Sequence, residues 1–136
     1  MQTLKTHILN EKRKQILPLL EMWKNEYYLA GGTALALQIG HRDSVDFDFF
    51  KQEPFDVGQM IKKTQKVFNK NLLSIVQIEK NTLSVLVDEE IKISFMTYSY
   101  PLIEAIVKTD HISLASVPDI ACMKLSTIMQ RSALKD

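Results

Sequence analysis

The sequence has a single cysteine and no long apolar run, and both features limit the class of protein to which it can belong. The single cysteine, Cys122, excludes a disulfide framework and favours a reducing, cytoplasmic setting. No apolar run approaches the roughly 20 residues that a membrane-spanning helix needs. Residues 1–15 contain no apolar core long enough for a signal peptide. We therefore expect a cytoplasmic protein without a membrane segment.

The charges are nearly balanced, and the sequence has no repeat, low-complexity tract or shift in composition that would mark a linker. A net charge of +1 gives no general attraction to nucleic acid or membranes. The hydrophobic share of 46% and the charged share of 24% are those of an ordinary globular protein. At 136 residues the chain can bury a core without disulfides, so we expect one domain, residues 1–136.

The hydrophobic pattern predicts an α+β fold with a mixed sheet of four to six strands flanked by helices. We expect helices at about 10–25, 34–39, 56–69 and from 118 towards the C-terminus, and strands at 27–30, 45–50, 72–78, 82–87, 91–96 and 111–114. Pro18 removes a backbone donor, so it should kink or restart the first helix. Thr33 can cap the second helix, and Gly40 is well placed to end it.

Two carboxylates lie two residues apart on one predicted strand, at Asp46 and Asp48. Because strand side chains alternate between faces, both should point to one side, and Phe47 and Phe49 to the other. The α-carbons of the two aspartates would lie roughly 6 to 7 Å apart. Their oxygens can therefore converge on a hard divalent cation such as Mg²⁺. Metal ions in such a site activate an attacking oxygen and steady a leaving pyrophosphate.

A glycine-rich turn precedes this strand. Gly31-Gly32-Thr33 lets a backbone or a phosphate approach closely. At a helix N-terminus, its N–H groups and hydroxyl can bind a triphosphate. Each feature alone has another interpretation: two glycines often form only a tight turn, and an Asp-x-Asp strand is often an exposed strand face or a glycosyltransferase metal site. Together and in this order, they predict a site of phosphoryl chemistry.

The predicted last helix carries a cationic stripe. At about 100° per residue, Lys124, Arg131 and Lys135 fall within roughly 20° of one line. Such a stripe can contact a triphosphate or an RNA backbone, or it can be a solvated helix face. The same helix is expected to pack through an apolar face and to hold its cysteine in the core; these residues are Ala121, Cys122, Leu125 and Met129.

Residues 31–50, GGTALALQIGHRDSVDFDFF, closely resemble the AbiEii-type abortive-infection nucleotidyltransferase toxin family, within the DNA polymerase β-like nucleotidyltransferase superfamily. In that family a His-Arg-x-Ser-x-Asp-apolar-Asp block follows the Gly-Gly turn. Here the block consists of His41, Arg42, Ser44, Asp46 and Asp48. The end of the chain resembles a later motif of the family, a lysine followed by Arg and then Lys-Asp, at Lys124, Arg131, Lys135 and Asp136.

The resemblance implies a polymerase β-like fold and a Mg²⁺-dependent enzyme that transfers a nucleotidyl group from an NTP to an acceptor hydroxyl, possibly on a tRNA. It implies that Asp46 and Asp48 bind the metal and that they act in catalysis together with Lys124. The NTP would be contacted by Gly31, Gly32, Thr33, Arg42, Ser44 and Lys124. A toxin would also need a cognate antitoxin. Residues 1–136 would form the nucleotidyltransferase core, possibly as the N-terminal part of a longer family member.

Ser94 departs from the family pattern. Members often have a third carboxylate on the strand expected at 91–96, and a serine is a poor metal ligand that cannot act as a general base. Asp88, Glu89 or Glu90 would have to substitute from the turn before that strand. The alternative hypothesis is therefore a catalytically impaired module that keeps the fold and binds or regulates without turnover.

Overall fold

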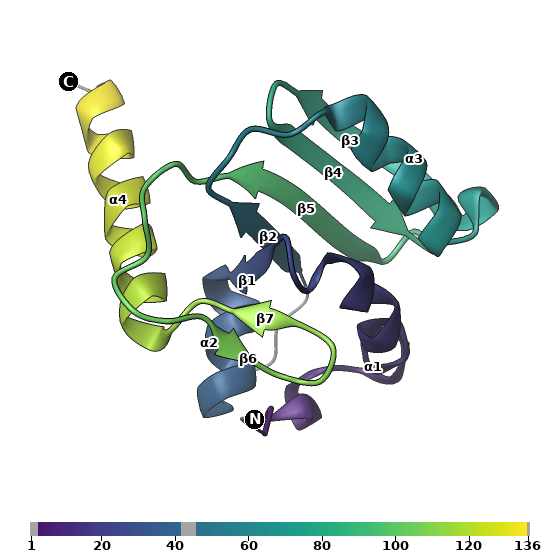
Figure 1. Cartoon of the computed structure of the whole chain (residues 1–136), viewed down its shortest axis with the longest axis horizontal. Coiled ribbons are helices and arrows are strands. Elements are labelled where there is room, and N and C mark those ends of the chain that lie inside the picture. Colours follow the sequence, from purple (N-terminus) through teal and green to yellow (C-terminus); the bar gives the residue numbers. More distant parts are fainter. Residues whose placement is uncertain (1–2, 42–45, 136) are drawn as a thin grey trace.

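The computed structural model describes residues 3–41 and 46–135 and shows an α+β fold built on one mixed sheet (Figure 1). The helices are α1 (Glu11–Ile16), α2 (Gly31–Ile39), α3 (Val57–Val67) and α4 (Val117–Lys135), with 3₁₀ segments η1 (Thr6–Ile8), η2 (Leu17–Trp23) and η3 (Lys70–Leu72). The strands are β1 (Tyr28–Ala30), β2 (Phe47–Lys51), β3 (Leu73–Glu79), β4 (Thr82–Val87), β5 (Ile91–Thr97), β6 (Val107–Lys108) and β7 (Ser113–Leu114).

The seven strands are ordered β3-β4-β5-β2-β1-β7-β6. Strand β2 lies at the centre, parallel to β5 and antiparallel to β1. The mixed sheet agrees with the expectation, but seven strands exceed the predicted four to six. The additional strand is β6, because two residues are too short to show a periodic pattern, whereas β7 lies within the strand expected at 111–114.

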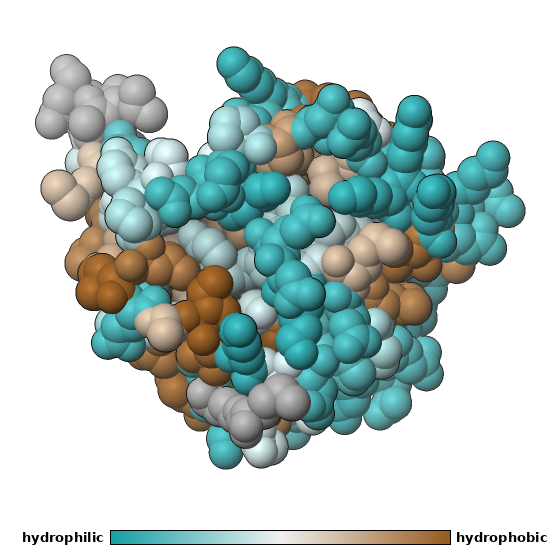
Figure 2. Space-filling view, in the orientation of Figure 1, coloured by the Kyte–Doolittle hydropathy of each residue, from teal (hydrophilic) through white to brown (hydrophobic). Residues whose placement is uncertain are grey.

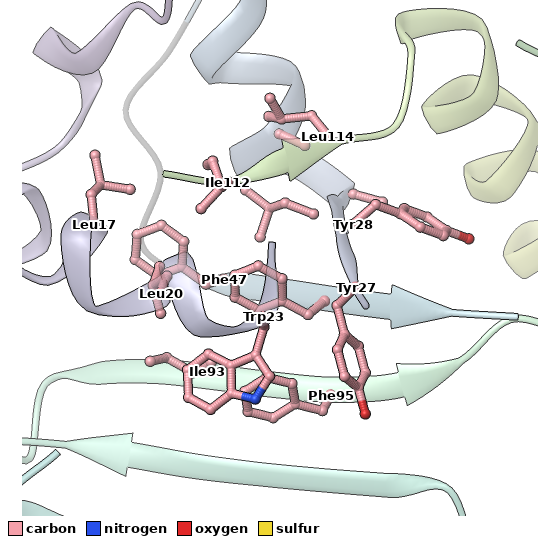
Figure 3. Packing of buried hydrophobic residues seen from close by; sticks show 14 of the residues in the cluster. Leu17, Leu20, Trp23, Tyr27, Tyr28, Phe47, Ile93, Phe95, Ile112 and Leu114 are labelled. Atoms are coloured by element: carbon pink, nitrogen blue, oxygen red, sulfur yellow. The ribbon is translucent and has the colours of Figure 1, made fainter. Parts of the chain in front are cut away.

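One face of the central strands forms the core of the molecule (Figure 3). Phe47 and Phe49 of β2 are at most 1% exposed, as the alternation predicts, and Phe49 stacks on Phe95 of β5. Trp23 of η2 covers this layer, with its ring 5.0 Å from that of Phe95. The side chains of β2 that alternate with these phenylalanines, Asp48 and Phe50, therefore face the other side of the sheet.

The first helical segment changes geometry at its proline. The α-helix ends at Ile16, and a 3₁₀ segment that contains Pro18 continues from Leu17 to Trp23. The expected interruption is thereby confirmed. The α-helix begins at Glu11 because the side chain of Asn10 caps it, accepting a hydrogen bond from the backbone N–H of Arg13.

Helix α2 begins earlier than the sequence pattern predicted. Its first residue is Gly31 and its N-cap is Ala30, so the prediction that Thr33 caps a helix from residue 34 is wrong. The Thr33 hydroxyl instead donates a hydrogen bond to the backbone carbonyl of Asp46. Gly40 ends the helix in a left-handed conformation, with φ of +64°, as expected.

Helix α4 packs through a different face from the predicted one. Its buried side chains include Ile120 and Met123, whereas Leu125 and Met129 are 59% and 69% exposed. Cys122 is also exposed, so its assignment to the core is wrong. Figure 1 shows the C-terminal half of α4 extending away from the sheet, and the exposed apolar side chains Leu125, Ile128 and Met129 belong to this helix. Figure 2 shows hydrophobic side chains gathered on this side of the molecule.

None of the helices that the structure describes is both long and apolar enough to cross a membrane.

Candidate functional site

A cavity of about 420 Å³ lies between the start of α2, the central strand β2 and helix α4. It is on the face of the sheet opposite the phenylalanine layer. Its lining residues come from four parts of the chain: Gly31, Gly32, Leu35, Asp48, Phe50, Tyr98, Ile120, Ala121, Met123, Lys124 and Thr127. Four of the residues predicted from sequence, Gly31, Gly32, Asp48 and Lys124, thus surround one space.

The first turn of α2 approaches Asp48 very closely. Gly31 has φ of +77°, and a Cβ added to it would lie 3.3 Å from Asp48 Oδ2. Only glycine combines this backbone conformation with this proximity at low cost. The N-cap residue, Ala30, makes no side-chain cap hydrogen bond to this nine-residue helix, and the positive end of the helix dipole lies at the same point. The helix end is therefore suited to an anion placed beside a carboxylate.

Asp48 is a half-buried carboxylate in unfavourable surroundings. Burial raises the pKa of Asp48, the nearby charge of Asp46 raises it further, and Lys92 partly opposes both effects. Within the residues that the structure describes, no hydrogen bond or salt bridge joins the Asp48 side chain to another residue. Among the residues 3–41 and 46–135, the carboxylate thus has no compensating partner, and burying a charged group without one is unfavourable.

Asp46 takes a different position from the one predicted. Strand β2 begins at Phe47, so Asp46 directly precedes the strand instead of belonging to it. It is half-buried and is not among the residues that line the cavity. Its backbone is tied to α2 by the hydroxyl of Thr33, which does not line the cavity either. Asp46 acts on the cavity through its charge, which raises the pKa of Asp48.

The donors present fit a divalent cation that is shared with a substrate. Asp46 and Asp48 offer hard carboxylate oxygens, and Mg²⁺ favours one or two such ligands together with phosphate oxygens and water. A cation would also relieve the repulsion that raises the pKa of Asp48. The described residues contain no group of three or more His, Cys, Asp or Glu side chains that could hold a metal by themselves. The arrangement therefore matches a site completed by its substrate.

Ser94 occupies the strand position next to Asp48. The two residues are direct partners in the parallel β2/β5 pair. Ser94 is buried, and its hydroxyl lies 2.7 Å from that of Ser84 on β4, in a hydrogen bond. The position that a third carboxylate would occupy is thus filled by a neutral serine pair.

The acidic turn before β5 does not replace this carboxylate. Lys12 Nζ lies 2.9 Å from Asp88 Oδ2 and 3.0 Å from Glu90 Oε2, so both acids pair with α1. Glu90 also accepts a hydrogen bond from Asn10. Neither residue, nor Glu89 between them, lines the cavity, so the suggested substitution from residues 88–90 does not occur.

Helix α4 contributes the cation of the cavity. Lys124 is exposed and lines the space from α4. Arg131 lies two turns further along α4 and is exposed, outside the cavity lining. Arg42, Ser44 and Asp136, together with the side chain of Lys135, lie outside the described residues.

Sequence reasoning missed the apolar part of the cavity. Phe50 and Tyr98 line it from the sheet, and Leu35, Ile120 and Met123 line it from the helices. One signal was present for Phe50, which follows Asp48 by two residues and so shares its face. Tyr98 extends the same alternation from Ser94, but it follows the end of β5, where the sequence indicated only a turn or an extended connection.

Comparisons with known proteins agree with this geometry. A family model described as "Nucleotidyl transferase AbiEii toxin, Type IV TA system" matches residues 19–136. An uncharacterised protein of Aquifex aeolicus (strain VF5) is 43% identical over 116 residues, which cover 82% of this chain and 54% of the relative. The chain thus spans about half the length of this relative.

Two solved structures share the fold. One is described as a proposed nucleotidyltransferase from H. pylori: its TM-score is 0.58 at 16% identity, over 86% of this chain and 59% of the other. The second is JHP933 from Helicobacter pylori, with a TM-score of 0.58 at 17% identity, over 90% of this chain and 57% of the other. At these identities the likeness establishes the architecture alone.

Proposed function

The chain belongs to the AbiEii nucleotidyltransferase toxin family, and from this premise we propose that it transfers a nucleotidyl group from an NTP to an acceptor hydroxyl with the help of Mg²⁺. One observation carries the proposal. The glycine-led start of α2, the carboxylate of Asp48 and the ammonium of Lys124 surround the same cavity, although they come from three distant parts of the chain.

The triphosphate would lie between the start of α2 and Lys124. The N–H groups of the first turn and the positive end of the helix dipole attract phosphate oxygens. Lys124 faces that end from α4 and adds a full positive charge. These groups would hold the phosphates beside Asp48. The ribose and the base would then lie in the part of the cavity that is lined by the sheet.

Asp48 and Asp46 would hold Mg²⁺ together with oxygens of the triphosphate. When bound, the ion offsets negative charge on the phosphates and on the two carboxylates. The half-buried position of Asp48 strengthens this interaction, because charges attract more strongly where less water screens them.

The reaction is an in-line displacement at the α-phosphorus. The oxygen of the acceptor hydroxyl forms a bond to that phosphorus while the bond to the bridging oxygen breaks. Pyrophosphate leaves with the electron pair of the broken bond. The hydroxyl proton passes to solvent water, since Ser94, the residue beside Asp48, cannot accept it. Lys124 and the start of α2 stabilise the charge that develops on the leaving group.

The family suggests the biological setting. As the toxin of a toxin–antitoxin system, the protein would act in the cytoplasm and would be neutralised by a cognate antitoxin. Its acceptor would be an RNA such as tRNA. The net charge of +1 provides little general attraction to RNA. Acceptor recognition would therefore depend on local groups such as the exposed cations of α4.

A second candidate function is favoured by the serine pair. Ser94 and Ser84 are buried and hydrogen bonded to each other where a third carboxylate would complete a two-metal site. A domain with this substitution can bind a nucleotide and a single cation and yet turn over slowly or not at all. It would then act as a nucleotide-dependent binding or regulatory module.

One experiment separates the two candidates. The protein is incubated with tRNA, Mg²⁺ and each NTP labelled at its α-phosphate, and the label on the RNA is measured along with nucleotide binding. Transfer that is lost in Asp48→Asn and Lys124→Gln supports the enzyme. Mg²⁺-dependent binding without transfer supports the binding module, and absence of both rejects the site.

A further inference from the structure

The proposed chemistry of phosphate and metal leaves the aromatic part of the cavity lining unused. This end is formed by Phe50 and Tyr98 from the sheet, and α4 adds Ile120 and Met123 to the lining. Resting on the proposed function, we propose that this end binds the nucleobase of the donor, which stacks on the ring of Tyr98 with Phe50 as its floor. The site then takes a nucleoside triphosphate, and a phosphorylated sugar without a base would bind poorly.

Strand geometry sets the distance between the two ends. Asp48 and Phe50 lie on one face of β2, with α-carbons about 6 to 7 Å apart. On the parallel neighbour β5, Ser94 is level with Asp48, and Tyr98 lies four residues further along the same face, about 13 Å away in a fully extended chain. The backbone N–H of Tyr98 donates to the carbonyl of Lys51 at 2.9 Å, which fixes Tyr98 at the end of the β2/β5 pair.

The spacing fits a nucleotide that lies along the strands. Its phosphates are at one end and its base at the other, separated by a ribose. The charged end of the cavity is next to Asp48, and the aromatic end begins one strand repeat away at Phe50. A nucleotide with its phosphates at α2 would thus bring its base over Phe50 and towards Tyr98.

The side chains at this end are suited to a flat, apolar surface. The Phe50 ring packs against Tyr28, its cross-strand partner on β1, with centroids 6.1 Å apart and planes inclined by 25°. Tyr98 is half-buried and contacts Tyr100 with centroids 5.4 Å apart. On the opposite side, α4 presents Ile120 and Met123. Such a slot favours an aromatic ring held by stacking and dispersion over a polar group that needs hydrogen bonds.

Binding of a triphosphate with and without a base tests the proposal. Each of the four NTPs, and inorganic tripolyphosphate, is titrated calorimetrically into the full chain in the presence of Mg²⁺. We expect Tyr98→Ala to weaken the NTP that binds wild type best by about tenfold. The affinity for tripolyphosphate should stay unchanged, because Tyr98 does not contact the phosphates in this arrangement. Tyr98→Phe should retain the NTP affinity.

Tyr100→Ala is the matched control. Tyr100 contacts Tyr98 but is 59% exposed and does not line the cavity, so its removal should lower the NTP affinity much less than Tyr98→Ala does and leave the tripolyphosphate affinity unchanged. An unchanged NTP affinity in Tyr98→Ala overturns the inference, and so does an equal loss for tripolyphosphate. If wild type binds tripolyphosphate as tightly as every NTP, the proposed base site is rejected, whereas the proposed phosphate site is supported. If it binds neither, the proposed function fails as well.

Discussion

Asp48 on β2 and Ser94 on β5 are direct partners in a parallel strand pair, on the face of the sheet that carries the cavity. The carboxylate of Asp48 has no compensating partner among the described residues, whereas the hydroxyl of Ser94 is hydrogen bonded to Ser84. An acidic side chain with no hydrogen-bond partner among the described residues thus lies beside a neutral pair whose hydroxyls bond to each other. This difference between neighbours determines what the site can hold.

Substituting Ser94→Asp should create a third carboxylate beside Asp48. A further buried negative charge is unfavourable without a cation, so we expect the melting temperature in a metal chelator to fall by several degrees. Added Mg²⁺ should raise the melting temperature more than it does in wild type, because three carboxylates bind the ion better than two. Thermal unfolding with and without Mg²⁺ measures both effects.

Ser94→Asn is the control for this change. Asparagine has nearly the volume of aspartate without its charge, so it should reproduce the loss of packing and of the Ser84 hydrogen bond. It should not increase the response to Mg²⁺. An equal Mg²⁺-induced shift in wild type, Ser94→Asp and Ser94→Asn would show that this position is remote from the metal.

Gly31→Ala should damage both stability and binding. A residue with a side chain at φ of +77° costs about 1 to 2 kcal/mol. Its Cβ would also lie 3.3 Å from Asp48 Oδ2 and would displace that carboxylate. We expect a lower melting temperature, and NTP binding weaker by about tenfold, the size of one charge-assisted hydrogen bond.

Gly40→Ala is the control that separates the effect of backbone strain from an effect on the phosphate site. Gly40 also has a positive φ, of +64°, but its added Cβ would contact His7 and Lys5 outside the cavity. This variant should lose a similar amount of stability and bind NTP like wild type. Equal binding by Gly31→Ala and Gly40→Ala would contradict a role for the start of α2 in phosphate binding.

Lys124→Gln should weaken NTP binding by about tenfold or more, since it removes a charge-assisted contact to the phosphates. The melting temperature should change little, because Lys124 is exposed. Arg131→Gln removes a positive charge from the same helix outside the cavity lining and serves as the control. Calorimetric titration gives both affinities, and an equal loss in the two variants would point to a general effect of charge.

Asp48→Asn should stabilise the metal-free protein at neutral pH. The folded state raises the pKa of Asp48 above its ordinary value of 3.8. At pH values between the ordinary and the raised pKa, Asp48 therefore holds a proton in the folded protein that it has lost in the unfolded chain. Stability attributable to Asp48 is therefore present below its ordinary pKa and is lost as the pH rises through the raised one. The advantage of Asp48→Asn should grow over this interval and then remain constant.

The measurement is the melting temperature of wild type and Asp48→Asn against pH, with a metal chelator present. A difference that does not vary with pH would argue that burial imposes no cost on the charged carboxylate. A variant that is less stable than wild type at neutral pH would argue the same.

Local patterns in the sequence predicted the features that depend on one element. The alternation of Phe47 and Phe49 with Asp48 predicted which face of β2 is buried, and Gly40 marked the end of α2. Pro18 marked the change from α to 3₁₀ geometry. In each case the cause is a backbone or face preference of a single residue, which the neighbouring sequence already contains.

Features that depend on contacts between elements were beyond these patterns. Two neighbouring stripes of α4 are apolar, and only its packing against the body decides that Ile120 is buried and Leu125 exposed. Thr33 has the chemistry of a helix cap but binds the carbonyl of Asp46, because α2 lies against the start of β2. Tyr98 enters the cavity because β5 runs parallel to β2, a pairing that hydrophobic periodicity does not specify.

The central claim is that Asp48 and the start of α2 form one Mg²⁺-dependent nucleotide site, and calorimetric titration of the four NTPs tests it most directly. Wild type and Asp48→Asn are compared with and without Mg²⁺. The account predicts that wild type binds at least one NTP, that binding requires Mg²⁺, and that Asp48→Asn loses it while remaining folded. Failure to bind any NTP, or equal binding by Asp48→Asn, would contradict it.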